Sequence, residues 1–252
     1  MTTTPSLPWP RKKWFKVSCC PPNIVKTWGL LGSVQFSALA ETVAVHLYFG
    51  ADFTTKISGA DASIKVESGF PFSGNIKIST SFEKSFELAL RIPGWSRGNY
   101  KASAEGREKD GYLYVKVPSG SFEMDLDFPM EPRFMYAHPR TRKDEVAIVR
   151  GPLVYCAESP DNDFDLEAAY VSDQSKISES VQSELASVRD VPVLEVPCKV
   201  KKGLDDWSAE LYSTQPPQWE DGHTLKFVPY FLRGNRGGSG AMRVWMGRSL
   251  SE

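Results

Sequence analysis

Two adjacent cysteines, Cys19 and Cys20, are the residues of this sequence whose type and spacing are best suited to chemistry. Pro21 and Pro22 follow them directly. Proline is tolerated in the first turn of a helix, where its missing N–H needs no partner, and it pushes the preceding residue towards extended geometry. We therefore expect Cys20 to lie just outside the start of a helix. The partial positive charge at a helix N-terminus favours a thiolate over a thiol.

Three interpretations of this cysteine pair stay open on these residues alone. A disulfide between neighbours is disfavoured, because their Cα atoms are about 3.8 Å apart, below the usual disulfide range, although a strained redox switch would use such a bond. Two buried, inert thiols are the second interpretation, since cysteine is often buried. The third is a thiolate site, in which the sulfur atoms act as metal ligands or as a nucleophile.

The residues after the prolines predict one long helix over residues 22–40, because apolar side chains recur there at helical spacing. Gly29 and Gly32 each cost roughly 1 kcal/mol relative to alanine, so tertiary packing has to support this helix. Apolar side chains nearly all round a helix are typical of burial, yet little other helix is predicted. We expect this apolar surface to pack on the β structure, to self-associate or to stay exposed. The side chains are Ile24, Val25, Trp28, Leu30, Leu31, Val34, Phe36 and Leu39.

From Val43 onward the pattern changes to the alternation of half-buried strands, separated by Gly, Pro, Ser and Asp clusters. Short strands at this spacing favour a sandwich or barrel, and prolines between residues 130 and 145 indicate a domain boundary. The expected fold is mainly β, with two consecutive β-sandwich domains over residues 43–136 and 137–252. The candidate strands are residues 43–49, 63–67, 75–79, 86–92, 112–117, 123–128, 146–149, 153–157, 193–200, 224–229 and 242–246.

Two further segments lack the alternation of apolar and polar residues that predicts a strand. Within the polar, Ser-rich segment 159–190, four apolar residues are spaced as one helical face would be. The glycine-rich run 234–240 lacks the lysine of a phosphate-binding loop and precedes a strand pattern, so we expect it to connect two strands of a hairpin. The four apolar residues are Ile177, Val181, Leu185 and Val188.

The remaining residue types that could do chemistry favour structural roles. Cys156 and Cys198 lie in apolar strand patterns without the paired spacing of a structural zinc site, so we expect buried side chains. The histidines show no ligand spacing and are expected to be surface or hydrogen-bonded residues; they are His46, His138 and His223.

Tryptophan side chains can stack on sugar rings, but a buried aromatic anchor is the commoner role and the one we expect. The tryptophans concerned are Trp95, Trp207, Trp219 and Trp245.

Composition excludes several classes of protein. The 252 residues carry a formal net charge of −1, with basic and acidic side chains interspersed, so no nucleic-acid surface is expected. No apolar run reaches the ~18 residues of a membrane span. The four cysteines make no disulfide framework in a chain of this length, and residues 1–10 lack the apolar core of a secretory signal. These features predict a reducing, cytoplasmic setting.

The sequence Cys19-Cys20-Pro21-Pro22-Asn23, after Trp14-Phe15, resembles the signature of glycoside hydrolase family 127, the β-L-arabinofuranosidase-like enzymes. Later stretches agree with that family in order along nearly the whole chain. They are residues 90–95 (Leu-Arg-Ile-Pro-Gly-Trp), 128–130 (Phe-Pro-Met), 150–155 (Arg-Gly-Pro-Leu-Val-Tyr) with Glu158, 229–230 (Pro-Tyr), 235–237 (Asn-Arg-Gly) and 244–245 (Val-Trp).

The resemblance implies a fold, an activity and a site. Members of this family fold as an (α/α)6 barrel followed by two β-sandwich domains, and they release β-L-arabinofuranose with retention of configuration. A retaining glycosidase normally uses two carboxyl groups; in this family a cysteine thiolate is the nucleophile, and three cysteines and a glutamate bind zinc. By position, Cys19 resembles the nucleophile and a zinc ligand, and Cys20 resembles a second zinc ligand.

The rest of that site does not carry over to this sequence. In the family, the third zinc cysteine, the zinc glutamate, the acid/base glutamate and the sugar-binding histidines precede the Cys-Cys motif, whereas the eighteen residues before Cys19 contain no acid, cysteine or histidine. Arg233 and Gly234 stand where the family usually has Trp-Ala. The chain therefore resembles the C-terminal part of a family member. Residues 1–42 would be a remnant of the catalytic barrel, and the predicted helix would be the last helix of that barrel.

Two function classes follow. One is a hydrolase of arabinofuranoside-containing glycans, with little or no activity expected from this chain alone. The other is a non-catalytic β-sandwich module that binds carbohydrate or packs on a partner.

Overall fold

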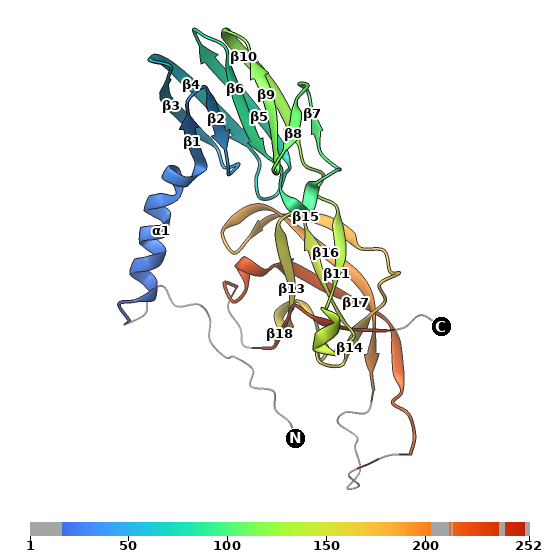
Figure 1. Cartoon of the computed structure of the whole chain (residues 1–252). Helices are drawn as coiled ribbons and strands as arrows, with labels where there is room; N and C mark the ends of the chain where they lie inside the picture. The colour runs from blue at the N-terminus through green and yellow to red at the C-terminus, as the bar shows by residue number, and fades with distance from the viewer. Residues whose placement is uncertain (1–16, 203–211, 213, 237–239, 250–252) are drawn as a thin grey trace. The chain divides into compact units, whose positions relative to one another are not determined.

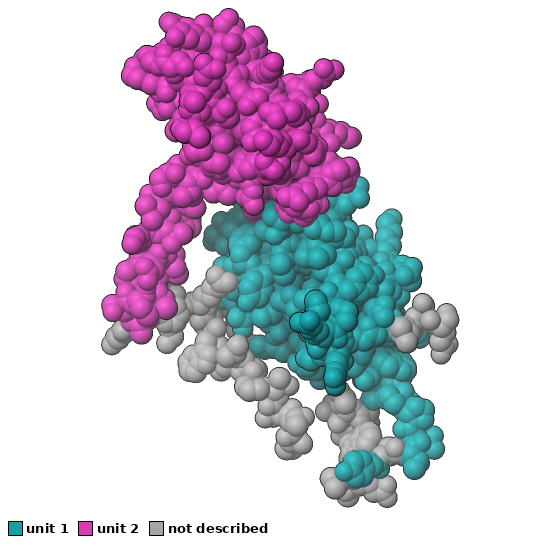
Figure 2. Space-filling model, in the orientation of Figure 1, with its two compact units in different colours: residues 1–13, 131–252 teal, residues 14–130 magenta. Residues whose placement is uncertain are grey.

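The structure is a computed structural model that describes residues 17–202, 212, 214–236 and 240–249, and strands dominate it after one α-helix (Figure 1). The mainly β fold expected from the sequence is confirmed. The chain divides into two compact units, one of residues 14–130 and one that includes residues 131–252 (Figure 2). We call them the N-terminal unit and the C-terminal unit. No helix in the described part of the chain has the length and apolarity needed to cross a lipid bilayer.

The helix α1 (Cys20–Gln35) is shorter at its C-terminal end than the predicted helix. Phe36 has an extended backbone, with φ −126° and ψ 153°, and begins strand β1 (Phe36–Leu39). Its ring stacks on the ring of Phe53, with centroids 4.6 Å apart. The helical prediction over residues 36–40 is therefore wrong, because strand pairing and burial of Phe36 outweigh the helical spacing of the apolar residues.

Two five-stranded sheets form the rest of the N-terminal unit. Neighbouring strands are antiparallel, apart from the parallel pair β2–β6. In order of pairing, the first sheet consists of β1, β2 (Thr42–Val45), β6 (Phe86–Arg91), β9 (Tyr112–Val117) and β8 (Arg107–Lys109). The second consists of β3 (Ala51–Ile57), β4 (Ala60–Ser68), β5 (Asn75–Phe82), β10 (Gly120–Asp127) and β7 (Lys101–Ala102).

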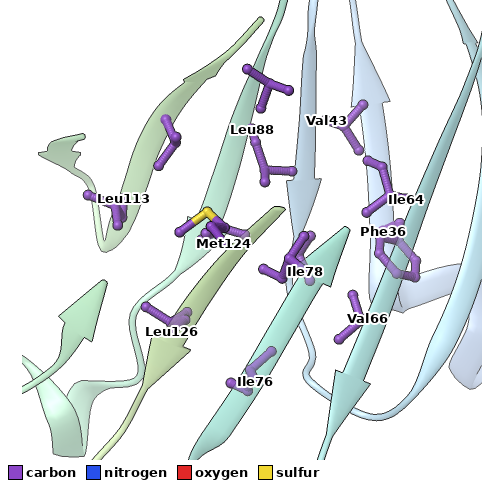
Figure 3. Close-up of a cluster of buried hydrophobic side chains, with 14 of the residues drawn as sticks. Phe36, Val43, Ile64, Val66, Ile76, Ile78, Leu88, Leu113, Met124 and Leu126 are labelled. Carbon is purple, nitrogen blue, oxygen red and sulfur yellow. The ribbon is translucent and has the colours of Figure 1, made fainter. Parts of the chain in front are cut away.

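Alternation along these strands produces the core of the N-terminal unit. In β4, Ile64 and Val66 are buried and Lys65 between them is exposed, because successive side chains of a strand point to opposite faces. Buried side chains from both sheets, among them Leu88 and Ile78, meet in one cluster (Figure 3). The sequence alternation that predicted strands from residue 43 onward therefore also identifies the inner face of each sheet.

An aromatic cluster closes one part of this core around the fully buried ring of Phe128. The rings of Tyr48 and Trp95 lie 5.4 and 5.9 Å from it, centroid to centroid. Trp95 lies on the short helix η1 (Gly94–Ser96) and is half-buried against the core, which confirms its predicted role as an anchor. Gly74 approaches the Phe128 backbone closely, and a Cβ there would lie 1.9 Å from the Phe128 carbonyl oxygen.

The C-terminal unit consists of one nine-stranded sheet that surrounds a second core. Its strands are β11 (Pro132–Tyr136), β12 (Glu145–Arg150), β13 (Leu153–Glu158), β14 (Ala169–Val171), β15 (Ser178–Leu185), β16 (Val188–Lys201), β17 (Trp219–Pro229), β18 (Met242–Arg243) and β19 (Met246–Arg248). Short 3₁₀ helices are η2 (Pro139–Thr141), η3 (Ser159–Asp161) and η4 (Tyr230–Leu232).

Strand β12 closes the sheet into a ring of strands, because it pairs with β13 as well as with its neighbours β11 and β19. The pairings therefore run continuously around the core. Residues 132–136, which the predicted boundary placed in the first domain, form β11 and pair within the C-terminal unit.

Two local predictions in this unit are wrong. The apolar residues at helical spacing between Ile177 and Val188 do not form a helix, because β15 pairs with β16 as a long hairpin. The glycine-rich run does not connect a hairpin either: β17 and β18 both pair with β13, on its two sides. Residues 237–239 of this run lie outside the described part.

The close approach of Gly74 to Phe128 leads to a stability prediction. Replacement Gly74→Ala would force the two backbones apart, and we expect a loss of about 1–3 kcal/mol in the free energy of unfolding, as for other overpacked sites. Thermal and urea unfolding measure it. The matched control is Gly94→Ala in the same unit, because a Cβ at Gly94 meets no atom within 4 Å. Equal stability of the two variants would contradict the close approach.

Candidate functional site

Cys19 and Cys20 lie at the N-terminal end of α1. Cys19 is the N-cap residue, with φ −82° and ψ −50°, and Cys20 is the first helical residue. The prediction that Cys20 lies outside the helix is therefore wrong. Pro21 and Pro22 occupy the first turn, where no N–H needs a partner, so the turn extends back over the residue before them.

The helix N-terminus is tied together locally. The Asn23 side-chain nitrogen donates to the carbonyl oxygen of Cys19 at 2.7 Å, and the Thr27 hydroxyl donates to the carbonyl oxygen of Asn23 at 2.8 Å. No side chain caps the helix at Cys19. Asn23, the last residue of the Cys-Cys-Pro-Pro-Asn sequence, therefore fixes the backbone that carries the first sulfur.

The two thiols are exposed and free, and their sulfur atoms are 3.4 Å apart. Exposure rules out the interpretation of buried, inert thiols. Two sulfur atoms at this distance could approach one metal ion together, but a zinc site takes at least three protein ligands. Within the residues that the structure describes, no three Cys, His, Asp or Glu side chains gather into such a set. The described residues alone therefore do not make a zinc site.

Cys156 and Cys198 do not join this pair. Both are buried in the C-terminal unit, as predicted. Burial raises the pKa of the Cys156 thiol to about 12 and that of Cys198 to about 11. Thiols that stay protonated at neutral pH are poor nucleophiles and poor metal ligands, so a structural role fits both.

The histidines are held by hydrogen bonds or ring contacts, which agrees with the prediction. His46 Nε2 is 2.9 Å from the Ser37 hydroxyl, and its Nδ1 is 2.8 Å from the Tyr112 hydroxyl. His138 accepts a hydrogen bond from the backbone N–H of Arg140. His223 packs edge-to-face against Phe164, with ring centroids 5.1 Å apart.

A buried ion cluster joins two of the stretches on which the family resemblance rests. The guanidinium of Arg236 donates to the carboxylates of Glu158 and Asp161, and all three side chains are at least 87% buried. The backbone N–H of Gly234 also donates to Glu158, at 2.9 Å. Burial opposes the charge on Arg236, but the hydrogen bonds to Asp161 and Glu158 outweigh it and raise the pKa of the guanidinium. Residues far apart in the sequence are thereby fixed to one another.

The tryptophans differ in burial. Trp219 and Trp245 are 41% and 39% exposed, so the prediction of buried anchors is wrong for both. Trp219 packs edge-to-face against Tyr170, with centroids 5.1 Å apart. Trp207 lies outside the described residues.

The sequence was compared with models of protein families and with known proteins. The family model "Beta-L-arabinofuranosidase, GH127 middle domain" matches residues 42–130, and "Glycoside hydrolase family 127 C-terminal domain" matches residues 132–247. The non-reducing end β-L-arabinofuranosidase of Bifidobacterium longum subsp. longum is 32% identical over 94% of this chain.

Solved structures show the same fold. A family 127 β-L-arabinofuranosidase from Geobacillus stearothermophilus T6 aligns with a TM-score of 0.83 and 31% identity, over 95% of this chain and 39% of that one. Another family 127 β-arabinofuranosidase aligns with a TM-score of 0.80 and 26% identity, over 96% of this chain and 40% of that one.

The chain is thus a glycoside hydrolase-like protein, and it belongs to glycoside hydrolase family 127, of which it carries the middle and C-terminal domains. It spans 38% of the length of the Bifidobacterium relative.

The ion cluster leads to a second stability prediction. Replacement Arg236→Gln leaves two buried carboxylates without their cation, and breaking a buried pair in this way costs about 3–5 kcal/mol. The matched control is Lys199→Gln in the same unit, where the exposed ion pair with Asp221, at 3.4 Å, contributes at most about 1 kcal/mol. Urea unfolding of both variants measures the difference. A cost for Arg236→Gln no larger than for Lys199→Gln would contradict the structural role of the cluster.

Proposed function

We propose that this chain is part of a retaining β-L-arabinofuranosidase-like glycoside hydrolase in which Cys19 is the nucleophile. The observation that carries the proposal is the free, exposed thiol pair at the N-terminus of α1, in a chain that belongs to glycoside hydrolase family 127. The substrate class, arabinofuranoside-containing glycans, is taken from the activity named for the relatives.

The proposed reaction begins with attack of the Cys19 thiolate on the anomeric carbon. A carbon–sulfur bond forms, the glycosidic carbon–oxygen bond breaks, and the leaving oxygen takes a proton from an acid. Water then attacks the same carbon: it gives a proton to the conjugate base of that acid, the carbon–sulfur bond breaks and the thiolate is restored. The two inversions give net retention. In the described part of the chain, no carboxylate makes a hydrogen bond or ion pair with Cys19 or Cys20. We propose that the acid is supplied by residues outside this part.

We also propose that Cys19 and Cys20 are two of the ligands of a zinc ion. Bound zinc keeps a coordinating thiol deprotonated. Because two ligands do not suffice, the remaining ligands have to come from outside the described residues, as does the acid. The proximity of the two sulfur atoms and the exposure of both support this assignment.

Little or no hydrolysis is therefore expected from the purified chain. Loss of general acid catalysis typically lowers a rate by 10²–10⁴-fold, and loss of substrate positioning lowers it further. The measurement is release of the aryl alcohol from an aryl β-L-arabinofuranoside, with zinc and a reductant, for the native chain and for Cys19→Ser.

Equal, near-zero rates in both proteins support an incomplete site. Turnover well above background that disappears in Cys19→Ser would show that the site is complete, and would overturn the expected inactivity while supporting the nucleophile. Turnover that persists in Cys19→Ser would overturn the role of Cys19.

The alternative function, packing on a partner, is favoured by one observation. The side chains of Val25 and Trp28 on α1 are 63% and 73% exposed, and Pro21 and Gln35 are the only buried residues of the helix. Of the three outcomes expected for the apolar surface of the helix, packing on the β structure is therefore the one that the structure does not show. We propose that the helix of one copy contacts that of another when the chain is alone.

Sedimentation velocity tests this contact. The native chain is expected to sediment as a dimer or larger species, and the double variant Val25→Ser, Trp28→Ser as a monomer, because large exposed apolar patches are uncommon on soluble monomers. The control is Val181→Ser, which removes an apolar side chain of similar exposure, 61%, from β15. A native chain that is monomeric at all concentrations and binds no hydrophobic dye would rule the contact out.

A further inference from the structure

The C-terminal unit has an open hollow of about 560 Å³ that the proposed hydrolytic site does not use. Its size lies in the range of small-molecule sites in proteins, about 300–1,000 Å³. Strands β12, β13 and β18, the start of η4 and the residues between β18 and β19 contribute to it. Its lining residues are Lys143, Glu145, Val154, Tyr230, Met242, Arg243, Val244 and Trp245.

Two aromatic side chains at this hollow are open to solvent. Tyr230 is 43% exposed and Trp245 is 39% exposed. Among the described residues neither ring packs against another aromatic ring, unlike the ring of Trp219. An exposed aromatic face offers a flat apolar surface with a polar tip, which matches a sugar ring, whose C–H groups form flat faces edged by hydroxyl groups.

Groups of both charges border these rings. Glu145 contributes a carboxylate whose side chain is 19% exposed, and it lies 3.6 Å from the Arg243 guanidinium and 3.9 Å from the Lys143 ammonium. Arg243 is also paired with Glu167. Because the cations and carboxylates compensate one another, the hollow is not selective for a charged ligand. Carboxylate oxygens accept hydrogen bonds and the cations donate them, so the two together suit hydroxyl groups, which do both.

The backbone that carries Trp245 is held in place before any ligand arrives. The Arg243 Nε donates to the carbonyl oxygen of Trp245 at 3.1 Å. Strand β18, which leads to Trp245, pairs with β13 at Ala157 and Glu158. A binding surface that is fixed in advance loses less entropy on binding, and this holds for the wall that carries Trp245.

The same wall is anchored by the segment between β13 and η3. The backbone N–H of Ala241 donates to the Ser159 hydroxyl at 2.9 Å, and the N–H of Ser159 donates to the carbonyl oxygen of Ala241 at 3.1 Å. The ion cluster of Glu158 and Asp161 with Arg236 fixes the other end of the connection. Tyr230 and Trp245 therefore belong to chain segments that are tied to one frame.

We propose that this hollow binds one or two sugar rings of a neutral oligosaccharide, with Tyr230 and Trp245 as stacking surfaces and with Glu145 and Arg243 as hydrogen-bonding groups. That the sugar contains arabinofuranose rests on the proposed function; the neutral, hydroxyl-rich chemistry rests on the hollow itself. The site lies within the C-terminal unit and needs neither Cys19 nor Cys20.

Isothermal titration calorimetry of the full chain tests the proposal. The probes are a β-L-arabinofuranosyl disaccharide and a xylose oligomer of equal length. We expect saturable binding of the arabinofuranosyl probe, and a loss of affinity of about tenfold or more in Trp245→Ala and in Tyr230→Ala, as for aromatic residues that anchor an interface. Circular dichroism and thermal unfolding check that each variant is folded.

The matched control is Trp219→Ala, because Trp219 has a similar exposure, 41% against 39%, in the same unit and lies outside the hollow. Unchanged binding in Trp219→Ala and weakened binding in Trp245→Ala support the site. Binding of the xylose oligomer alone, with the same dependence on Trp245, supports the hollow and overturns the arabinofuranose assignment.

Two further outcomes overturn the proposal itself. One is the absence of binding of either probe; if Trp245→Ala then changes the sedimentation coefficient, the surface is a protein contact instead. The other is binding that Trp245→Ala leaves unchanged. If such binding disappears in Cys19→Ser, the sugar lies at the thiol pair, which supports the proposed hydrolase and refutes the hollow. Because Cys19→Ser is expected to bind as the native chain does, failures of the two proposals are distinguishable.

Discussion

The guanidinium of Arg236 is paired with the carboxylates of Glu158 and Asp161, and these ion pairs hold the irregular segment after η4 to the segment after β13. The described residues between η4 and β18, 233–236 and 240–241, are neither strand nor helix. An irregular segment needs partners for its polar groups if it is to keep one conformation. Removing charges from water is costly unless they are paired and hydrogen-bonded. Here both carboxylates share one cation, through its two terminal nitrogen atoms, so this geometry pairs both buried carboxylates at once and fixes the chain segments that carry them.

The sequence predicts most of the strands and little of how they connect. Alternation identifies β4, β5, β6 and β9, because one face of each sheet meets a core and the other meets water. It fails where pairing decides instead: Phe36 has the spacing of the helix before it, but its ring stacks on Phe53 and its backbone pairs with β2. Similarly, the spacing of Val181 and Leu185 predicts one face of a helix, but in the structure these residues lie on β15, which pairs with β16 as a hairpin. Local periodicity contains no information about such partners.

For the candidate site, the sequence identified the residues and not their surroundings. The Cys-Cys-Pro-Pro pattern correctly predicted a pair of sulfur atoms at a helix N-terminus, and the placement of Cys20 was wrong by one residue. The resemblance to the family singled out Glu158 and Arg236, but nothing in the sequence showed that they form an ion pair, because 78 positions separate them. The open rings of Tyr230 and Trp245 were also missed, since the sequence does not show which aromatic side chains a sheet leaves uncovered.

In the described part of the chain, helix α1 is fastened to the rest of the N-terminal unit at its C-terminal end. Gln35 is buried, its side chain donates to the carbonyl oxygen of Phe49 at 2.6 Å, and its own carbonyl oxygen accepts from the N–H of His46 at 2.8 Å. The 16 residues of the helix place the thiols roughly 24 Å from this attachment, at 1.5 Å per residue. A change in the angle of the helix at Gln35 therefore moves the thiols at its far end. A tilt of about ten degrees there moves the sulfur atoms by about 4 Å, whereas catalysis requires reacting atoms to be placed within about 1 Å. A second surface that packs on the exposed apolar side chains of the helix would prevent this tilt.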